Sequence, residues 1–84
     1  MAGDLTPEQW EQIAQFYIRD GWLVCAYCTQ RIPGSQACQE HIIPLSKGGK
    51  HTASNVCISC LACNDQKGTQ TWRPKLWHPL MRHV

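Results

Sequence analysis

The apolar residues of the first quarter of the chain lie on one face of a helix. Thr6 is placed as an N-cap, Pro7 occupies the first helical position, and Gln9 can complete a capping box with Thr6. Apolar side chains then recur with helical spacing at Trp10, Ile13, Ala14, Tyr17 and Ile18. Gly21 is the expected C-cap. The pattern predicts an N-terminal helix over residues 6–20 whose apolar side chains pack in the core.

After this helix the pattern changes to short apolar runs separated by turn residues. Strands are predicted at residues 22–27, 36–45 and 55–58. Turn or loop residues occupy 32–35 and 46–50. A second helix is expected from Cys60 to about Thr69, followed by an irregular tail over 70–84 that is rich in tryptophan and proline. Because the chain shows no internal repeat and no linker, we predict a single domain over residues 1–84.

Six cysteines in 84 residues change this picture. A domain of this size builds a marginal hydrophobic core and often adds disulfides or a structural metal. The opening residues MAGDLTPEQW lack the basic start and apolar core of an export signal, and no apolar run is long enough to cross a bilayer. We therefore expect a soluble, intracellular, cytoplasmic protein in which the cysteines bind metal, and not a disulfide-rich secreted peptide.

Four of the cysteines form two CxxC pairs, Cys25/Cys28 and Cys60/Cys63. Each pair lets two sulfur atoms point at one centre from a tight turn, and two such turns close a tetrahedron with no open position. This spacing predicts a structural zinc ion that joins the two knuckles across the intervening strand-loop-strand segment. Zinc binding of this kind can supply most of the folding free energy of a small domain.

The two remaining cysteines leave an alternative open. Cys57 precedes Cys60 by three residues, so Cys57/Cys60 is also a CxxC pair and competes as a ligand pair. We favour Cys60/Cys63, because Cys63 and Asn64 then begin the second helix. Cys38 and Cys57 are interpreted as core residues, since a buried cysteine behaves as a small hydrophobic side chain.

Charge is distributed unevenly along the chain. The first 40 residues hold two basic and five acidic residues, whereas the remaining 44 hold six basic residues and one acidic residue. A polyanionic partner such as DNA would therefore meet the C-terminal half. The candidate phosphate contacts are Lys47, Lys50, Lys67 and Arg73. Trp72 and Trp77 are expected to pack the tail against the second helix.

Residues 40–68, EHIIPLSKGGKHTASNVCISCLACNDQKG, resemble the signature of the HNH endonuclease family, the ββα-metal nucleases with flanking zinc-binding CxxC pairs. The shared features are an acid-histidine pair, a Gly-Gly loop, an asparagine before the second strand, and CxxCNxxK. The resemblance extends from Cys25 to about Gly68. It implies an α+β fold, with two strands and a helix around a catalytic metal, a treble-clef-like zinc site, and the N-terminal helix packed outside.

The resemblance also implies roles for single residues. His41 matches the catalytic histidine and would act as general base, a task that suits an imidazole with an ordinary pKa of about 6.5. Glu40 and Asn64 match the metal-ligand positions and offer oxygen atoms to Mg²⁺ or Mn²⁺. Asn55 matches the middle asparagine, which braces the loop and orients the histidine. His51, in the same loop, either contacts substrate or caps the loop.

Two positions depart from the common pattern of the family. Glu40 stands where aspartate is frequent, and Asn64 replaces the last histidine, but both keep an oxygen donor. We therefore expect a metal-dependent endonuclease that nicks DNA or cleaves both strands. The alternative is a catalytically inactive, zinc-dependent nucleic-acid-binding module. Because no segment resembles a recognition module, we expect sequence specificity to be low or to be supplied by a partner, either a second copy of the chain in a homodimer or a larger protein.

Overall fold

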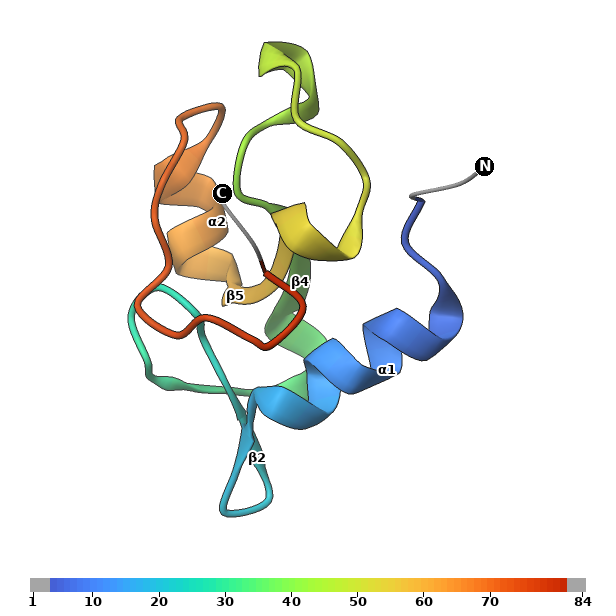
Figure 1. Cartoon of the computed structure of the whole chain (residues 1–84). Helices are drawn as coiled ribbons and strands as arrows, with labels where there is room; N and C mark the ends of the chain where they lie inside the picture. The colour runs from blue at the N-terminus through green and yellow to red at the C-terminus, as the bar shows by residue number, and fades with distance from the viewer. Residues whose placement is uncertain (1–3, 82–84) are drawn as a thin grey trace.

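The computed structural model describes residues 4–81, and its first element is the predicted helix, α1 (Pro7–Phe16) (Figure 1). The capping box is present: the Gln9 N–H donates to the Thr6 hydroxyl at 3.1 Å, and the Thr6 N–H donates to the Gln9 side chain at 3.0 Å. Ile13 is buried on the inner face of α1, and Tyr17 is buried as its C-cap. The predicted start of this helix, with Thr6 as N-cap and Pro7 in the first helical position, is therefore confirmed.

The end of α1 differs from the prediction. The helix ends at Phe16, and Gly21 instead forms a two-residue turn with Asp20 between β1 (Ile18–Arg19) and β2 (Trp22–Val24). Asp20 and Gly21 have φ values of 52° and 81°, the left-handed conformation that two-residue hairpins require. Because Asp-Gly favours such a turn, the hairpin replaces the last helical turn. Ile18 is consequently exposed and is not part of a helical apolar face.

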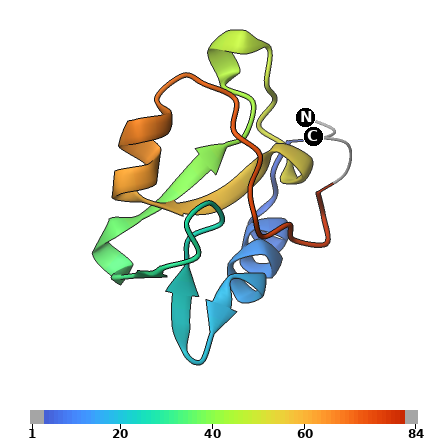
Figure 2. The same cartoon turned by 90° about the vertical axis from the view of Figure 1, so that its left-hand side faces the viewer.

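A second, two-stranded sheet carries the segment that resembles the nuclease signature. Strand β4 (Ala37–His41) pairs antiparallel with β5 (Val56–Cys60), and α2 (Leu61–Lys67) follows β5 directly (Figure 2). The first sheet is completed by β3 (Arg31–Ile32), which pairs with β2. Two strands followed by a helix, beside a cysteine cluster suited to zinc, confirm the predicted α+β, ββα class.

Strand β4 is shorter than predicted, because the chain leaves the sheet after His41. The Ile42 N–H then donates to the Asn55 carbonyl, and the predicted loop contains a 3-10 turn over Leu45–Lys47. A further 3-10 turn over Ala53–Asn55 leads into β5. The loop therefore starts and ends beside the last residues of the sheet, where Glu40 and His41 lie.

The tail is irregular, as predicted, but it is fixed to the domain by specific hydrogen bonds. The Tyr17 hydroxyl donates to the Leu76 carbonyl at 2.8 Å, and the His78 Nε2–H donates to the Val56 carbonyl at 2.7 Å. Trp72 lies edge-on against Tyr27, with ring centroids 5.6 Å apart. Trp77 is 38% exposed, so the prediction that it is buried between the tail and the second helix was wrong. The tail is held by the Leu76 carbonyl, by the N–H groups of Lys75 and Leu76, which donate to the Ala26 carbonyl, and by His78.

Two predictions concern the whole chain, of which the structure describes residues 4–81. No helix within residues 4–81 has the length and apolar character needed to span a membrane. The outermost residues of the predicted domain, 1–3 and 82–84, lie outside the described part of the chain.

Candidate active site and zinc centre

The cysteine sulfur atoms of the two predicted CxxC pairs come together. The Sγ atoms of the cluster all lie within 4.8 Å of one another, and they belong to Cys25, Cys28, Cys60 and Cys63. Cys28 Sγ and Cys60 Sγ are 3.8 Å apart. A tetrahedral zinc ion with Zn–S bonds of about 2.3 Å requires sulfur atoms about 3.8 Å apart. The cluster is therefore compatible with a structural zinc ion.

Backbone N–H groups point at the sulfur atoms of both knuckles. The N–H groups of Tyr27 and Cys28 donate to Cys25 Sγ at 3.4 and 3.5 Å. The Cys63 N–H donates to Cys60 Sγ at 3.4 Å, which makes Cys60 the N-cap of α2. These donors favour thiolates, the form in which cysteine binds metal. A metal ion here would join the first knuckle to the junction of β5 and α2.

The remaining cysteines lie outside this cluster. Cys57 is fully buried in the core, and burial raises the pKa of its thiol to about 12. This confirms its core position, and the sulfur cluster described above contains Cys60 and Cys63 but not Cys57. The prediction of a core position for Cys38 was wrong: it is only half-buried, because β4 is an edge strand of a two-stranded sheet. Burial raises the pKa of the Cys38 thiol, and the Asn64 amide, which can donate to it, opposes that rise.

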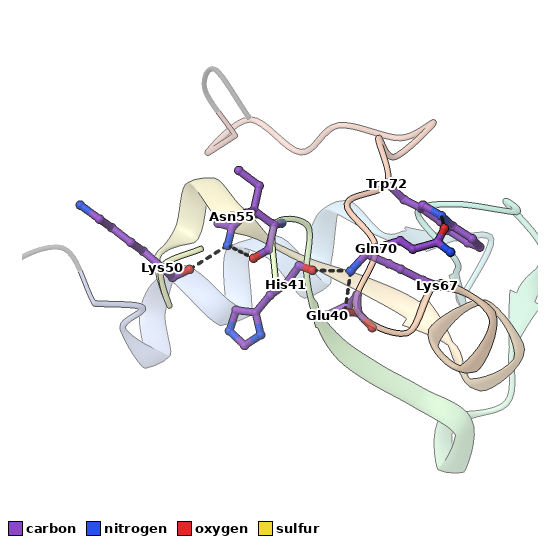
Figure 3. A network of polar contacts seen from close by, with 8 residues as sticks. Glu40, His41, Lys50, Asn55, Lys67, Gln70 and Trp72 are labelled. Atoms are coloured by element: carbon purple, nitrogen blue, oxygen red, sulfur yellow. Dashed lines mark hydrogen bonds and ion pairs between the residues drawn. The ribbon is translucent and has the colours of Figure 1, made fainter. Parts of the chain in front are cut away.

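Glu40 forms a buried ion pair with a lysine at the end of α2. The Lys67 ammonium donates to Glu40 Oε1 at 3.2 Å and to the His41 carbonyl at 2.8 Å (Figure 3). The Lys67 side chain has no exposed surface, and that of Glu40 is 10% exposed. The prediction that Lys67 contacts phosphate was therefore wrong. A lysine three residues after Asn64 on a helix was expected to face solvent, but α2 packs this face onto β4.

The second oxygen of Glu40 has no partner among the described residues. Glu40 Oε2 is buried and accepts no hydrogen bond. Asn64 precedes Lys67 by about one turn of α2 and reaches Cys38, two residues before Glu40 on β4. A carboxylate oxygen and an amide oxygen thus come from facing elements. Because an unpaired buried carboxylate oxygen is costly, it fits a divalent cation as its missing partner.

His41 lies at the end of β4 and contacts a second histidine. Its Nε2 atom is 2.9 Å from His51 Nδ1, and the two ring centroids are 5.2 Å apart. Partial burial lowers the pKa of His41; His51 and Lys67 lower it further, and Glu40 opposes them. These effects favour the neutral imidazole that a general base requires. No sequence pattern indicates the contact with His51, because the two residues are ten positions apart and are brought together by the fold of the loop.

Asn55 closes the loop between the two strands. Its side chain is buried, accepts from the Ile43 N–H at 2.9 Å, and donates to the carbonyls of Ile43 and Lys50 at 3.0 and 2.9 Å (Figure 3). Gly49 lies so close to this junction that a Cβ atom would be 1.8 Å from the Ile43 carbonyl oxygen. The second glycine of the Gly-Gly pair is therefore required by close backbone approach.

The other predicted phosphate contacts are accessible. Lys47 and Lys50 are exposed on the loop between β4 and β5, and Arg73 is exposed on the tail. Lys75, which the sequence analysis did not single out, is exposed near Arg73. The predicted phosphate contacts that remain available to a polyanion thus lie on the loop and the tail, and not on α2.

The chain was compared with curated proteins and with protein-family models. No curated protein matches the chain. A family model described as HNH endonuclease matches residues 25–78, which include both CxxC pairs, the β4-loop-β5 segment, α2 and most of the described tail. The match covers well over half of the chain and carries the four cysteines positioned to bind a metal ion. The chain belongs to the HNH endonuclease family.

Proposed function

We propose that the chain is a divalent-metal-dependent endonuclease that hydrolyses phosphodiester bonds of DNA. Family membership supports nuclease activity and a nucleic-acid substrate. The observation that carries the finer proposal is the unpartnered, buried Glu40 Oε2 at the end of β4, beside His41 and facing the helix that bears Asn64. A carboxylate oxygen, an amide oxygen and a histidine base are the groups that hydrolysis of a phosphodiester needs.

Glu40 and Asn64 would hold the catalytic Mg²⁺ or Mn²⁺, and the cysteine cluster would hold the structural zinc ion. When bound, the divalent ion supplies charge neutralisation at the phosphate and at the leaving oxygen. Lys67 holds Glu40 through Oε1 alone, which leaves Oε2 as the donor. The carboxylate is therefore fixed in orientation before any ion arrives.

The protein's own groups perform the remaining tasks. His41 takes the proton from the attacking water, since its partly buried imidazole is neutral near pH 7. Asn55 keeps the loop closed by its bonds to Ile43 and Lys50. Lys47, Lys50 and Arg73 bind phosphates without sequence choice, because they offer charge and not a pattern of base contacts.

The test is a plasmid-nicking assay on zinc-loaded protein with and without Mg²⁺ or Mn²⁺. The wild type should cut only with added metal. His41→Ala should slow cleavage about a hundred- to ten-thousandfold while zinc content and DNA affinity stay near wild type. Full-rate cutting by His41→Ala would contradict the assignment of His41 as the base.

The metal ligands are tested separately from the base by measuring Mn²⁺ binding directly. Glu40→Gln keeps an acceptor for Lys67 but removes the charge, and Asn64→Ala removes the amide oxygen. Both should weaken Mn²⁺ binding, whereas Gln66→Ala, an exposed position on the same helix, should not. Equal Mn²⁺ affinity in all three variants would refute the proposed catalytic metal site.

The alternative is a zinc-dependent nucleic-acid-binding module without catalysis, which the basic loop and tail also support. Under both proposals, DNA affinity should fall steeply as the salt concentration rises. Removal of one phosphate contact should make the slope of log affinity against log salt concentration shallower by about 0.9. This is tested with the single variants Lys47→Ala, Lys50→Ala and Arg73→Ala. A wild type that binds DNA but cuts with neither metal would favour the binding module.

A further inference from the structure

The contact between His41 and His51 has a consequence for which nitrogen of His41 can act as base. A hydrogen bond between two neutral imidazoles needs one N–H donor and one bare nitrogen. His41 Nε2 and His51 Nδ1 are 2.9 Å apart, so one of them carries the shared proton. The two assignments place the proton of neutral His41 on different ring nitrogens.

If His51 Nδ1 donates, then both nitrogens of His41 are occupied: Nε2 accepts the hydrogen bond and Nδ1 carries the proton. If His41 Nε2 donates, then Nδ1 keeps a free lone pair. The second assignment places both histidines in the Nε2–H tautomer, which a histidine side chain prefers intrinsically. The first requires both in the less stable Nδ1–H form. The geometry together with this preference therefore favours His41 as the donor.

His51 is held in place by backbone contacts on both sides. The Lys50 carbonyl, one residue before it, accepts from the Asn55 amide at 2.9 Å. The carbonyl of His51 itself accepts from the Leu5 N–H at 2.7 Å, directly before α1. The N-terminal segment thus fixes the position of His51, although it lies outside the residues matched by the family model.

We propose that His51 is a positioning residue that holds His41 in the Nε2–H tautomer and so leaves Nδ1 as the nitrogen that accepts the proton from water. This inference rests on the proposed nuclease function. In the step, the water O–H bond breaks and its proton forms a bond to His41 Nδ1. The water oxygen forms a bond to phosphorus while the P–O bond to the leaving sugar oxygen breaks, and that oxygen takes a proton from solvent. His41 Nε2–H stays bonded to His51 Nδ1 throughout, so the imidazolium is stabilised by an acceptor already in place.

The groups that face His41 come from three elements. His51 approaches from the loop, Glu40 is its neighbour on β4, and Lys67 contacts its backbone carbonyl from α2. Among the described contacts, only His51 reaches a ring nitrogen of His41. A change of tautomer in a His51 variant would therefore report on this contact and not on the buried ion pair.

The first measurement is the ¹⁵N NMR spectrum of the imidazoles in zinc-loaded protein, at a pH where both rings are neutral. The wild type should show His41 with a protonated Nε2 and a bare Nδ1. His51→Leu removes the acceptor and should give a mixture of tautomers, whereas His51→Asn, whose side-chain oxygen can replace Nδ1, should restore the wild-type pattern. A wild-type His41 in the Nδ1–H form would overturn the proposal.

The second measurement is metal-dependent cleavage by the same variants. His51→Leu should lower kcat about tenfold or more with little change in KM, and His51→Asn should recover most of the rate. Ser46→Ala, an exposed position on the same loop, is the matched control and should cut like the wild type. Equal kcat in His51→Leu and the wild type would refute the positioning role.

The two measurements separate this inference from the proposed function. If the wild type does not cut, the nuclease proposal fails and the NMR spectrum alone decides whether His51 sets the tautomer. If the wild type cuts and His51→Leu cuts equally well, the nuclease proposal stands and the role of His51 is refuted.

Discussion

Replacement of Lys67 by methionine tests the most unexpected contact of the site. Methionine fills a similar volume but cannot donate. Glu40 would therefore lose its one hydrogen-bond partner among the described residues, and the His41 carbonyl would lose its 2.8 Å bond. The carboxylate would then be buried with both oxygens unpaired. Removing one partner of a buried ion pair costs about 3–5 kcal/mol, and the slight exposure of Glu40 places the expected loss of unfolding free energy near the lower end.

The assay is urea unfolding of zinc-loaded protein, followed by tryptophan fluorescence. The double variant Lys67→Met/Glu40→Gln removes both charges and should regain a large part of the lost stability, because a neutral amide is cheaper to bury than a carboxylate. Lys75→Met, at an exposed lysine, should change stability by no more than about 0.5 kcal/mol.

A loss below about 1 kcal/mol in Lys67→Met would refute the buried pair. Lys67 would then have to face solvent, and the phosphate contact expected from the sequence would again be the better interpretation. An equal loss in the single and double variants would instead mean that the stability comes from the bond to the His41 carbonyl and not from the charge of Glu40.

Three further predictions follow from the same structure. Cys60→Ser should abolish zinc binding and unfold the domain, whereas Cys38→Ser should keep zinc, as measured by elemental analysis and circular dichroism. Gly49→Ala should lower the free energy of unfolding by about 1–3 kcal/mol, because its Cβ would lie 1.8 Å from a backbone oxygen. Gly34→Ala is the control, since a Cβ atom there would meet no neighbouring atom. Equal urea midpoints for the two variants would contradict the close approach at Gly49. Burial lowers the pKa of His78, so as pH falls the unfolded chain binds a proton at this histidine before the folded chain does. The free energy of unfolding should therefore decrease as pH drops below about 6.5, and it should decrease less steeply in His78→Gln. Parallel curves of unfolding free energy against pH for the two proteins would refute this.

Local interactions explain what could be predicted. The capping box joins Thr6 to Gln9, and each CxxC knuckle joins residues three apart, so both depend on neighbours in the sequence. The sequence left Cys57/Cys60 open as an alternative pair, and only the tertiary structure places Cys57 in the core and outside the sulfur cluster. Family resemblance supplied the roles of Glu40, His41, Asn55 and Asn64, which stay predictions until activity and metal binding are measured.

The tertiary structure decided the contacts between distant residues. Lys67 reads as a surface lysine in its helix and is buried only because α2 packs on β4, where Glu40 lies 27 residues earlier. His78 reads as a tail residue and is buried against Val56, 22 residues earlier. His51 meets His41 because Asn55 and Gly49 fold the intervening loop back on itself. A side chain's burial and its partner depend on which elements pack together, and the local sequence carries no record of that packing.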